Sequence, residues 1–201
     1  MTLKIAMQTI PLILLAALVV AILIPACAPN PNTSARVDEY KSILSETKTS
    51  STASSTADSK SAIGAFSNYL KKIDDKDYIE KNTHKVYAKD AYLNDTLVTH
   101  RGPEEIKKYF LATADTMEQY ELTIDDTASS GSEHYVRWTM IFTAPKLNGG
   151  KPIHSVGMSH VRLNQQGQVT MHQDFWDSGM NIYGQIPVLG GAIETIRLRF
   201  E

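Results

Sequence analysis

Residues 169–177 read Val-Thr-Met-His-Gln-Asp-Phe-Trp-Asp, and apolar and polar side chains alternate along them. Such alternation predicts a β-strand, whose successive side chains point to opposite faces. His172, Asp174 and Trp176 therefore share one face, and the residues between them share the other. A histidine, a carboxylate and an indole are costly to bury without partners. We expect their face to line a pocket, a water-filled cleft or a polar network.

Three further strands are predicted before this one, at residues 120–126, 134–144 and 153–164, with the final strand covering 168–177. Glycine-containing turn signals separate them, at residues 129–131, 147–150 and 164–167. Long strands joined by short turns are typical of an antiparallel meander. The second half of the chain is therefore expected to form most of one sheet.

The first half of the domain predicts helices and one hairpin. Apolar residues spaced three or four apart between Ile63 and Ile73 indicate an amphipathic helix, and a shorter helical piece follows at residues 75–82. Two strand-like runs, 86–93 and 96–100, flank the turn-forming pair Asn94 and Asp95. Pro103 lies near the start of a third helix. Helices followed by a long meander favour an α+β fold.

This element order carries a resemblance to a known fold family. The segments YLND before the hairpin turn, HRGPEEIKKYF at the third helix and SVGMSHVRLNQQGQVTMHQDFWD at the end resemble the nuclear-transport-factor-2-like superfamily, in particular its SnoaL-like branch. The resemblance covers residues 61–183. It implies a cone-shaped, strongly curved antiparallel sheet packed against two to three N-terminal helices, with a conical pocket between them. The superfamily includes isomerases, cyclases, epoxide hydrolases and many non-catalytic members.

In enzymes of that family a carboxylate inside the cone acts as a base on a lipophilic, ring-like substrate. Asp174 is the candidate for that role here, because it is central in its strand and lies beside Trp176. His172 is the candidate relay or orienting group, about 6.6–7 Å along the same face. Asp177 ends the strand, where a capping role is the default, and a bulge would turn it toward the pocket instead.

Three further side chains are predicted to contact a ligand: Tyr92 from the hairpin, and Tyr135 and Arg137 from the strand at 134–144. The two tyrosines are candidate hydrogen-bond donors. An alternative pairs Arg137 with Asp174 across the sheet, which would make the carboxylate a structural group and a poor base.

Metal and nucleic-acid functions find little support. His154 and His160 share a strand face but would lie about 20 Å apart at ~3.3 Å per residue, too far to bind one zinc ion. We predict neither a metal nor a cofactor. Lys and Arg total 20 against 22 Asp and Glu, so bulk charge gives no argument for nucleic-acid binding.

The first 27 residues predict export. One lysine precedes an apolar run from Ile10 to Ile24, and the only cysteine of the chain, Cys27, follows it. The segment resembles a bacterial lipoprotein signal, which implies cleavage before Cys27 and lipid on its sulfur. The alternative is an uncleaved anchor, since residues 5–26 as a helix would be about 33 Å long, enough to cross a ~30 Å hydrocarbon core. Both place the domain outside the cytoplasm, attached to a membrane.

The chain is thus divided into a signal or anchor (1–27), a flexible Ser/Thr-rich linker (28–60), with a transient helix as an alternative at residues 37–45, and one SnoaL-like domain (61–201). The domain includes a Gly-interrupted helical tail at 184–201. That tail is expected to cover the pocket mouth or form a dimer interface, and a further alternative places it on the membrane surface.

The resulting functional hypothesis is a membrane-tethered, extracytoplasmic domain that binds a small hydrophobic ligand, with a lipid-derived molecule as one option. One alternative is a cofactor-independent acid–base enzyme (an isomerase, cyclase or hydrolase) using Asp174. The other is a non-catalytic dimerisation module.

Overall fold

The computed structural model describes residues 32–48 and 56–200 of the chain. The chain divides into two compact units, Met1–Tyr40 and Lys41–Glu201. The second contains the sheet, the helices from Thr56 onward and the C-terminal part of helix 33–48. The predicted signal sequence and Cys27 lie outside the described residues. Among the helices of the described ranges, none is both long and apolar enough to cross a membrane.

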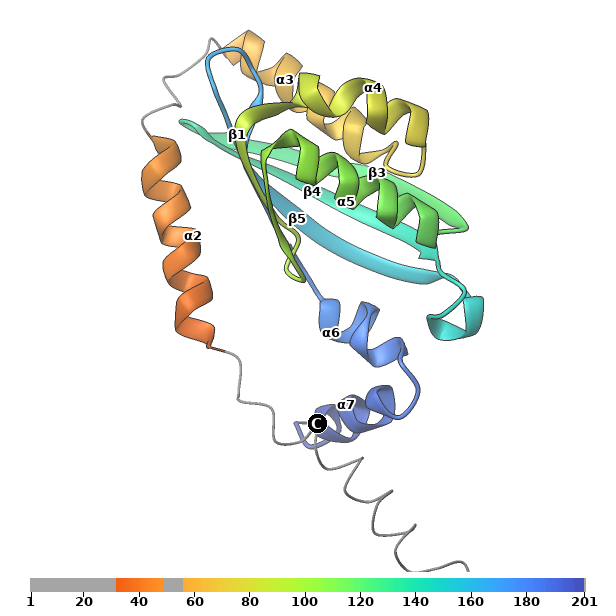
Figure 1. The fold of residues 1–201 in the computed structure, drawn as a ribbon. Coiled ribbons are helices and arrows are strands. Elements are labelled where there is room, and N and C mark those ends of the chain that lie inside the picture. The colour runs from red at the N-terminus through yellow and green to blue at the C-terminus, as the bar shows by residue number, and fades with distance from the viewer. Residues whose placement is uncertain (1–31, 49–55, 201) are drawn as a thin grey trace, which may run out of the picture. The chain divides into compact units, whose positions relative to one another are not determined.

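Six strands form one sheet in the order β2-β1-β6-β5-β4-β3 (Figure 1). Their bounds are β1 Tyr87–Asn94, β2 Thr99–Arg101, β3 Gln119–Ser130, β4 Glu133–Thr143, β5 Ile153–Leu163 and β6 Val169–Trp176. The predicted hairpin and the predicted meander are both present. All neighbouring strands are antiparallel except β1 and β6, which run parallel. No hairpin joins these two strands, so no tight turn forces an antiparallel direction on them.

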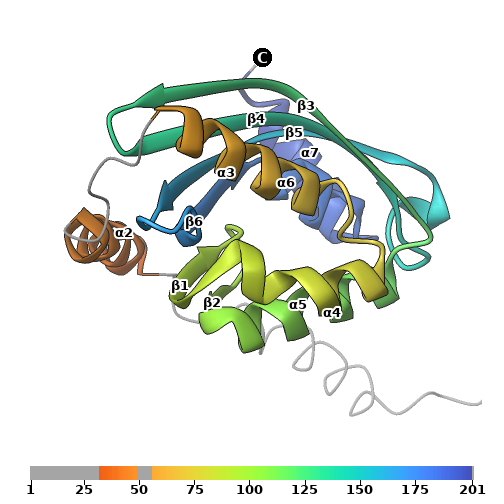
Figure 2. The same cartoon turned by 90° about the horizontal axis from the view of Figure 1, so that it is seen from above.

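Three helices, α3 (Thr56–Leu70), α4 (Lys76–Val86) and α5 (Gly102–Thr116), precede or interrupt the strands. The sheet bends around α3, with α4 and α5 beyond it (Figure 2). Asp75 caps α4 by accepting a hydrogen bond from the Tyr78 amide at 2.9 Å. The Tyr69 and Thr83 hydroxyls share a hydrogen bond of 2.8 Å that joins α3 to α4. The α+β fold with a curved sheet is therefore confirmed.

The inner face of the sheet, which faces these helices, carries the core. Its side chains pack with the apolar faces of α3, α4 and α5 in one cluster, whose fully buried members include Phe66, Tyr69, Ile79, Tyr87, Leu93, Ile106, Val136 and Val161. The register places Trp138, Gly157 and Trp176 side by side on β4, β5 and β6. The face of β6 that the sequence predicted to line a pocket, with Trp176 on it, therefore belongs to the inner face of the sheet.

Part of the expected linker is helical. α2 (Thr33–Lys48) lies within residues 28–60, which composition alone predicts to be a flexible spacer. Near its C-terminal end, Ile43 is only 1 % exposed. Arg162 of β5 donates hydrogen bonds to the Leu44 carbonyl oxygen and, at 2.9 Å, to the Thr47 hydroxyl. A single buried isoleucine and a distant arginine thus stabilise a segment that has little apolar surface of its own.

The chain after β6 forms α6 (Ser178–Asn181), η3 (Tyr183–Gln185) and α7 (Leu189–Arg197), and a short helix, η2 (Asn148–Gly150), precedes β5. Ile182 reaches the pocket described below. The apolar residues farther along do not, and Val188 and Phe200 are 92 % and 87 % exposed. Ile182 precedes the predicted tail, so residues 184–200 contribute no side chain to the pocket wall, and α7 does not cover the pocket.

Candidate functional site

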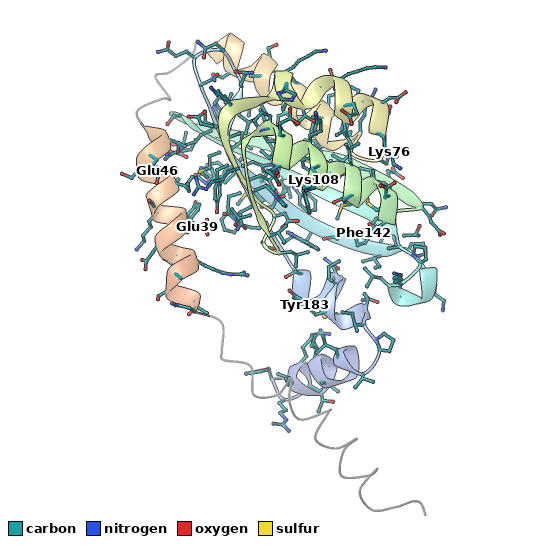
Figure 3. All side chains as sticks on the ribbon, viewed as in Figure 1. Glu39, Glu46, Lys76, Lys108, Phe142 and Tyr183 are labelled. Carbon is teal, nitrogen blue, oxygen red and sulfur yellow. The ribbon has the colours of Figure 1, made fainter. Side chains whose placement is uncertain are left out.

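A pocket of about 270 Å³ lies between the inner face of the sheet and helices α3 and α5. Its wall is mostly apolar and aromatic. Side chains crowd the space between sheet and helices in Figure 3, where Phe142 marks the end of β4 and belongs to the wall. Four polar or charged side chains of the wall lie on β5, β6 and the β1–β2 turn: Asp95, Ser159, His172 and Asp174.

Asp174 is held through one of its two carboxylate oxygens. Its Oδ1 accepts a hydrogen bond from the Ser159 hydroxyl at 2.5 Å and lies 2.8 Å from His172 Nε2. Trp138 Nε1 donates to the Ser159 oxygen at 3.1 Å, which leaves the serine proton for Asp174. Within the described residues Oδ2 has no hydrogen-bond partner, although the side chain is only 14 % exposed. The carboxylate is therefore fixed on one side and unoccupied on the other.

His172 is locked from both ring nitrogens. Its Nε2 faces a carboxylate oxygen, which can only accept, so Nε2 carries a proton. In the neutral ring Nδ1 is then an acceptor, and the Tyr87 hydroxyl donates to it at 3.0 Å. Burial, together with nearby Tyr69 and Asp174, raises the pKa of Tyr87, so its hydroxyl keeps the proton that it donates. Phe66 packs edge-on against the imidazole at 4.8 Å between ring centroids.

A second carboxylate, Asp95, is fully occupied by its own loop and by α5. Its Oδ1 accepts the backbone N–H groups of Leu97 and Val98, both at 2.9 Å, and its Oδ2 accepts the Tyr109 hydroxyl. The Asp95 carbonyl oxygen also accepts the indole N–H of Trp176 at 2.6 Å. Asp95 thus fixes two aromatic residues of the pocket wall.

The electrostatics of the wall are negative. Neither lysine nor arginine is among its side chains, while Asp95 and Asp174 both are. Burial and then Asp95 raise the pKa of Tyr109, and burial, Asp74 and Asp174 raise that of Tyr120. Both phenols are therefore neutral donors at physiological pH.

The predicted site residues separate into two groups. Asp174, His172 and Trp176 all line the pocket. Tyr92 and Tyr135 do not: Tyr92 lies under Arg101 on the outer face, and Tyr135 stacks on His160 at 4.8 Å between ring centroids.

The remaining two predicted residues also lie away from the wall. Arg137 is exposed and opposite Met158, whereas Asp174 is opposite Ser159, so Arg137 and Asp174 point to different faces. The alternative in which they pair is therefore wrong. Asp177 is exposed and caps α6, accepting the Met180 amide at 2.9 Å. No bulge turns it toward the pocket.

Sequence reasoning missed four residues that organise the site: Tyr87, Asp95, Trp138 and Ser159. Two of them had a usable signal, since Trp138 and Ser159 alternate in phase with the apolar residues of their strands. Tyr87 and Asp95 lie at the ends of β1, where alternation gives no warning of a contact with β6 or α5. The described residues also contain no group of three His, Cys, Asp or Glu side chains placed to hold a metal ion.

A curved sheet with an apolar pocket and a carboxylate on its inner face defines the class of nuclear-transport-factor-2-like domains. The chain belongs to the SnoaL-like domain family, whose sequence model matches residues 68–172. No curated protein sequence matches significantly.

Solved structures share the fold at low identity. TsrD from Streptomyces laurentii superposes with a TM-score of 0.52 and 17 % identity, covering 66 % of this chain and 96 % of that one. An LEH-like epoxide hydrolase from M. tuberculosis gives 0.51 and 15 % over 73 % and 96 % of the two chains. An NTF2-like protein of unknown function from Exiguobacterium gives 0.50 and 11 % over 58 % and 98 %. At these identities the likeness concerns the fold alone.

Proposed function

We propose that the domain binds a small, largely apolar molecule in this pocket, with a polar group of the ligand hydrogen-bonded to Asp174 Oδ2. The observation that carries the proposal is the half-occupied carboxylate of a pocket-lining residue: Oδ1 is held by Ser159 and His172, while Oδ2 has no partner among residues 32–48 and 56–200. Oδ2 is not one of the fully buried unpaired atoms of the described residues, so a hydrogen-bond donor that enters the pocket can reach it, and the ligand supplies the partner that the protein does not.

The size of the cavity restricts the ligand. About 270 Å³ is near the lower end of the range for small-molecule pockets. Ligand contact is expected mainly with aromatic and aliphatic side chains, so affinity comes from apolar burial and orientation comes from Asp174.

Filling the pocket tests the proposal. Ala144 lines the wall, and Ala144→Leu should reduce binding of small cyclic probes such as benzyl alcohol and benzylamine by about tenfold or more, because it occupies their space. Ala128→Leu, on an exposed part of β3, is the matched control. Calorimetric titration with equal binding by wild type and Ala144→Leu would place any ligand elsewhere and reject the proposal.

The free oxygen favours a second candidate, a cofactor-independent enzyme in which Asp174 acts as general base. Such a base needs one oxygen oriented and the other open to the substrate, which is the arrangement here. Asp174→Asn should then retain binding and lose turnover. Binding remains the better supported function, because the pocket offers no free side-chain donor to stabilise an oxyanion.

We further propose that the domain is exported and attached to a membrane through Cys27. The apolar run and the position of the lone cysteine support this. Metabolic labelling with a radioactive fatty acid should mark the wild type but not Cys27→Ser, and the variant should leave the membrane fraction. Size measurement of the released domain would show whether it is the homodimer of the assembly alternative.

A further inference from the structure

The hydrogen-bond donors of the pocket wall are all committed to protein acceptors. Four of these donors, on Ser159, Trp138, Trp176 and Tyr109, are described above. The other side-chain donors of the wall are also hydrogen-bonded to protein acceptors. Tyr120 donates to the Leu70 carbonyl oxygen at 2.7 Å, Thr113 to the Tyr109 carbonyl at 3.0 Å and Thr116 to the Thr113 carbonyl at 2.8 Å, and His172 Nε2 is directed at Asp174. A ligand carbonyl or carboxylate entering this space would find no side-chain donor.

Among the hydrogen-bond acceptors of the wall, Asp174 Oδ2 has no donor from the described residues. A ligand must therefore arrive as a donor. An alcohol and an amine both satisfy this requirement, and hydrogen bonding alone does not distinguish them.

Charge distinguishes them. The wall contains the carboxylates of Asp95 and Asp174 and neither lysine nor arginine, so it has no permanently cationic side chain, and His172 is the only titratable base of the described wall beside Asp174. The Arg137 that sequence reasoning offered as a counter-ion lies on the other face of the sheet. An alcohol would leave the charge of Asp174 uncompensated in an apolar cavity, whereas an ammonium group would pair with it.

The aromatic composition of the wall agrees with a cation. Six of its side chains are aromatic: Tyr109, Phe110, Tyr120, Trp138, Phe142 and Trp176. Aromatic faces attract ammonium groups, most strongly where water is excluded. Two of these rings, Tyr109 and Trp176, are fixed by hydrogen bonds to Asp95, so they need no reordering when a ligand enters.

We propose that the ligand class of this pocket is a small amine with an apolar body, bound as its ammonium ion with an N–H donated to Asp174 Oδ2. This inference rests on the proposed binding function and names the chemistry of its polar group.

The test compares three probes of nearly equal size: benzylamine, benzyl alcohol and benzoate. Titrated into the wild-type domain near neutral pH, benzylamine should bind at least about tenfold more tightly than benzyl alcohol, and benzoate should show no binding. This comparison needs no variant. Equal binding of amine and alcohol, or a preference for benzoate, would overturn the inference.

Two variants assign the preference to Asp174. Asp174→Asn retains an acceptor for Ser159 and should lower benzylamine affinity about tenfold or more, while benzyl alcohol changes less than about threefold. Asp90→Asn, an exposed carboxylate on β1, controls for overall charge and should change neither. If alcohol and amine bind equally and Ala144→Leu abolishes both, the binding function stands and the amine assignment fails. If no probe binds the wild type, both fail.

Discussion

Gly157 and Trp138 face each other across β4 and β5, and a Cβ atom placed on Gly157 would lie 2.4 Å from two carbons of the Trp138 indole. The indole therefore lies where any other side chain at position 157 would be. From that position its N–H reaches Ser159, which in turn donates to Asp174. The missing side chain is a condition for the hydrogen-bond chain that orients the carboxylate.

Gly157→Ala should accordingly displace Trp138 and break its hydrogen bond to Ser159. Overpacking of this kind costs about 1–3 kcal/mol of unfolding free energy. Denaturant unfolding measures the loss, and the emission of the two tryptophans reports the displacement. Gly64→Ala in α3 meets nothing within 4 Å and should leave both signals unchanged or stabilise the helix slightly. A Gly157→Ala domain as stable as wild type would show that the Trp138 indole can adopt another position at no cost in stability.

Tyr87→Phe should leave the buried Nδ1 of His172 without a donor. The expected cost is about 1–3 kcal/mol. Nitrogen NMR of the imidazole is the sharper readout: the neutral wild-type ring should carry its proton on Nε2, whereas the neutral variant ring should lose that single tautomer preference. Tyr135→Phe, away from the pocket, should change neither. An unchanged tautomer in Tyr87→Phe would mean that Asp174 alone fixes the ring.

Arg162→Met should release the end of α2. The guanidinium Nε lies 3.0 and 2.9 Å from the two Glu133 oxygens while Nη1 binds Leu44 and Thr47, so one side chain joins β4, β5 and α2. We expect a loss of about 1–3 kcal/mol, less than for a fully buried pair because Glu133 is 24 % exposed.

Amide hydrogen exchange should then accelerate in residues 43–47 of the Arg162→Met domain, with the strands β1 and β6 unaffected. Arg137→Met, an exposed arginine on β4, is the control. Unaltered protection of α2 in Arg162→Met would assign its docking to Ile43 alone.

Stability should decline on the acid side through the same cluster. Burial lowers the pKa of His160 below its ordinary 6.5 despite the attraction of Glu133, with Arg162 acting in the same direction as burial. Burial also lowers the pKa of His134, while the pKa of Glu133 falls below 4.5 because hydrogen bonds from Arg162 and His160 outweigh burial.

All three pKa values are lower in the folded state, so the unfolded chain binds more protons and stability falls as pH falls. The first loss should begin below about pH 6.5, from His160 and His134, and the second below about pH 4.5, from Glu133. Thermal unfolding between about pH 8 and 3 measures both losses. His160→Gln should weaken the first step, and the exposed His154→Gln should preserve it. A melting temperature that rises on acidification would contradict the assignment.

The alternation of apolar and polar residues predicted the part of the site that lies on a single strand, β6. Alternation placed His172, Asp174 and Trp176 on one face, and all three line the pocket. It does not give the phase of one strand relative to the next, which depends on register. The sequence therefore left open the alternative that Arg137 lies opposite Asp174, whereas the register places Ser159 there.

Other contacts depended on chain segments far apart in sequence. Asp95 was read as a turn residue, and its local bonds to Leu97 and Val98 agree with that, but its contact with Tyr109 requires α5 to pack beside the turn. The end of α2 likewise contacts Arg162, more than a hundred positions away in the sequence. The composition of a segment shows how much apolar surface the segment itself can bury, but not which distant residues will bind it.

The parallel pairing of β1 with β6 determines when the site can exist. Tyr87 and His172 are 85 positions apart, and the chain between them contains every other strand of the sheet. During synthesis the first of these strands must wait for the last to leave the ribosome, so its inner edge remains exposed while the meander folds. The hydrogen bond between Tyr87 and His172 can thus form only after the last strand has been added, so the pocket is complete only when the whole sheet is assembled.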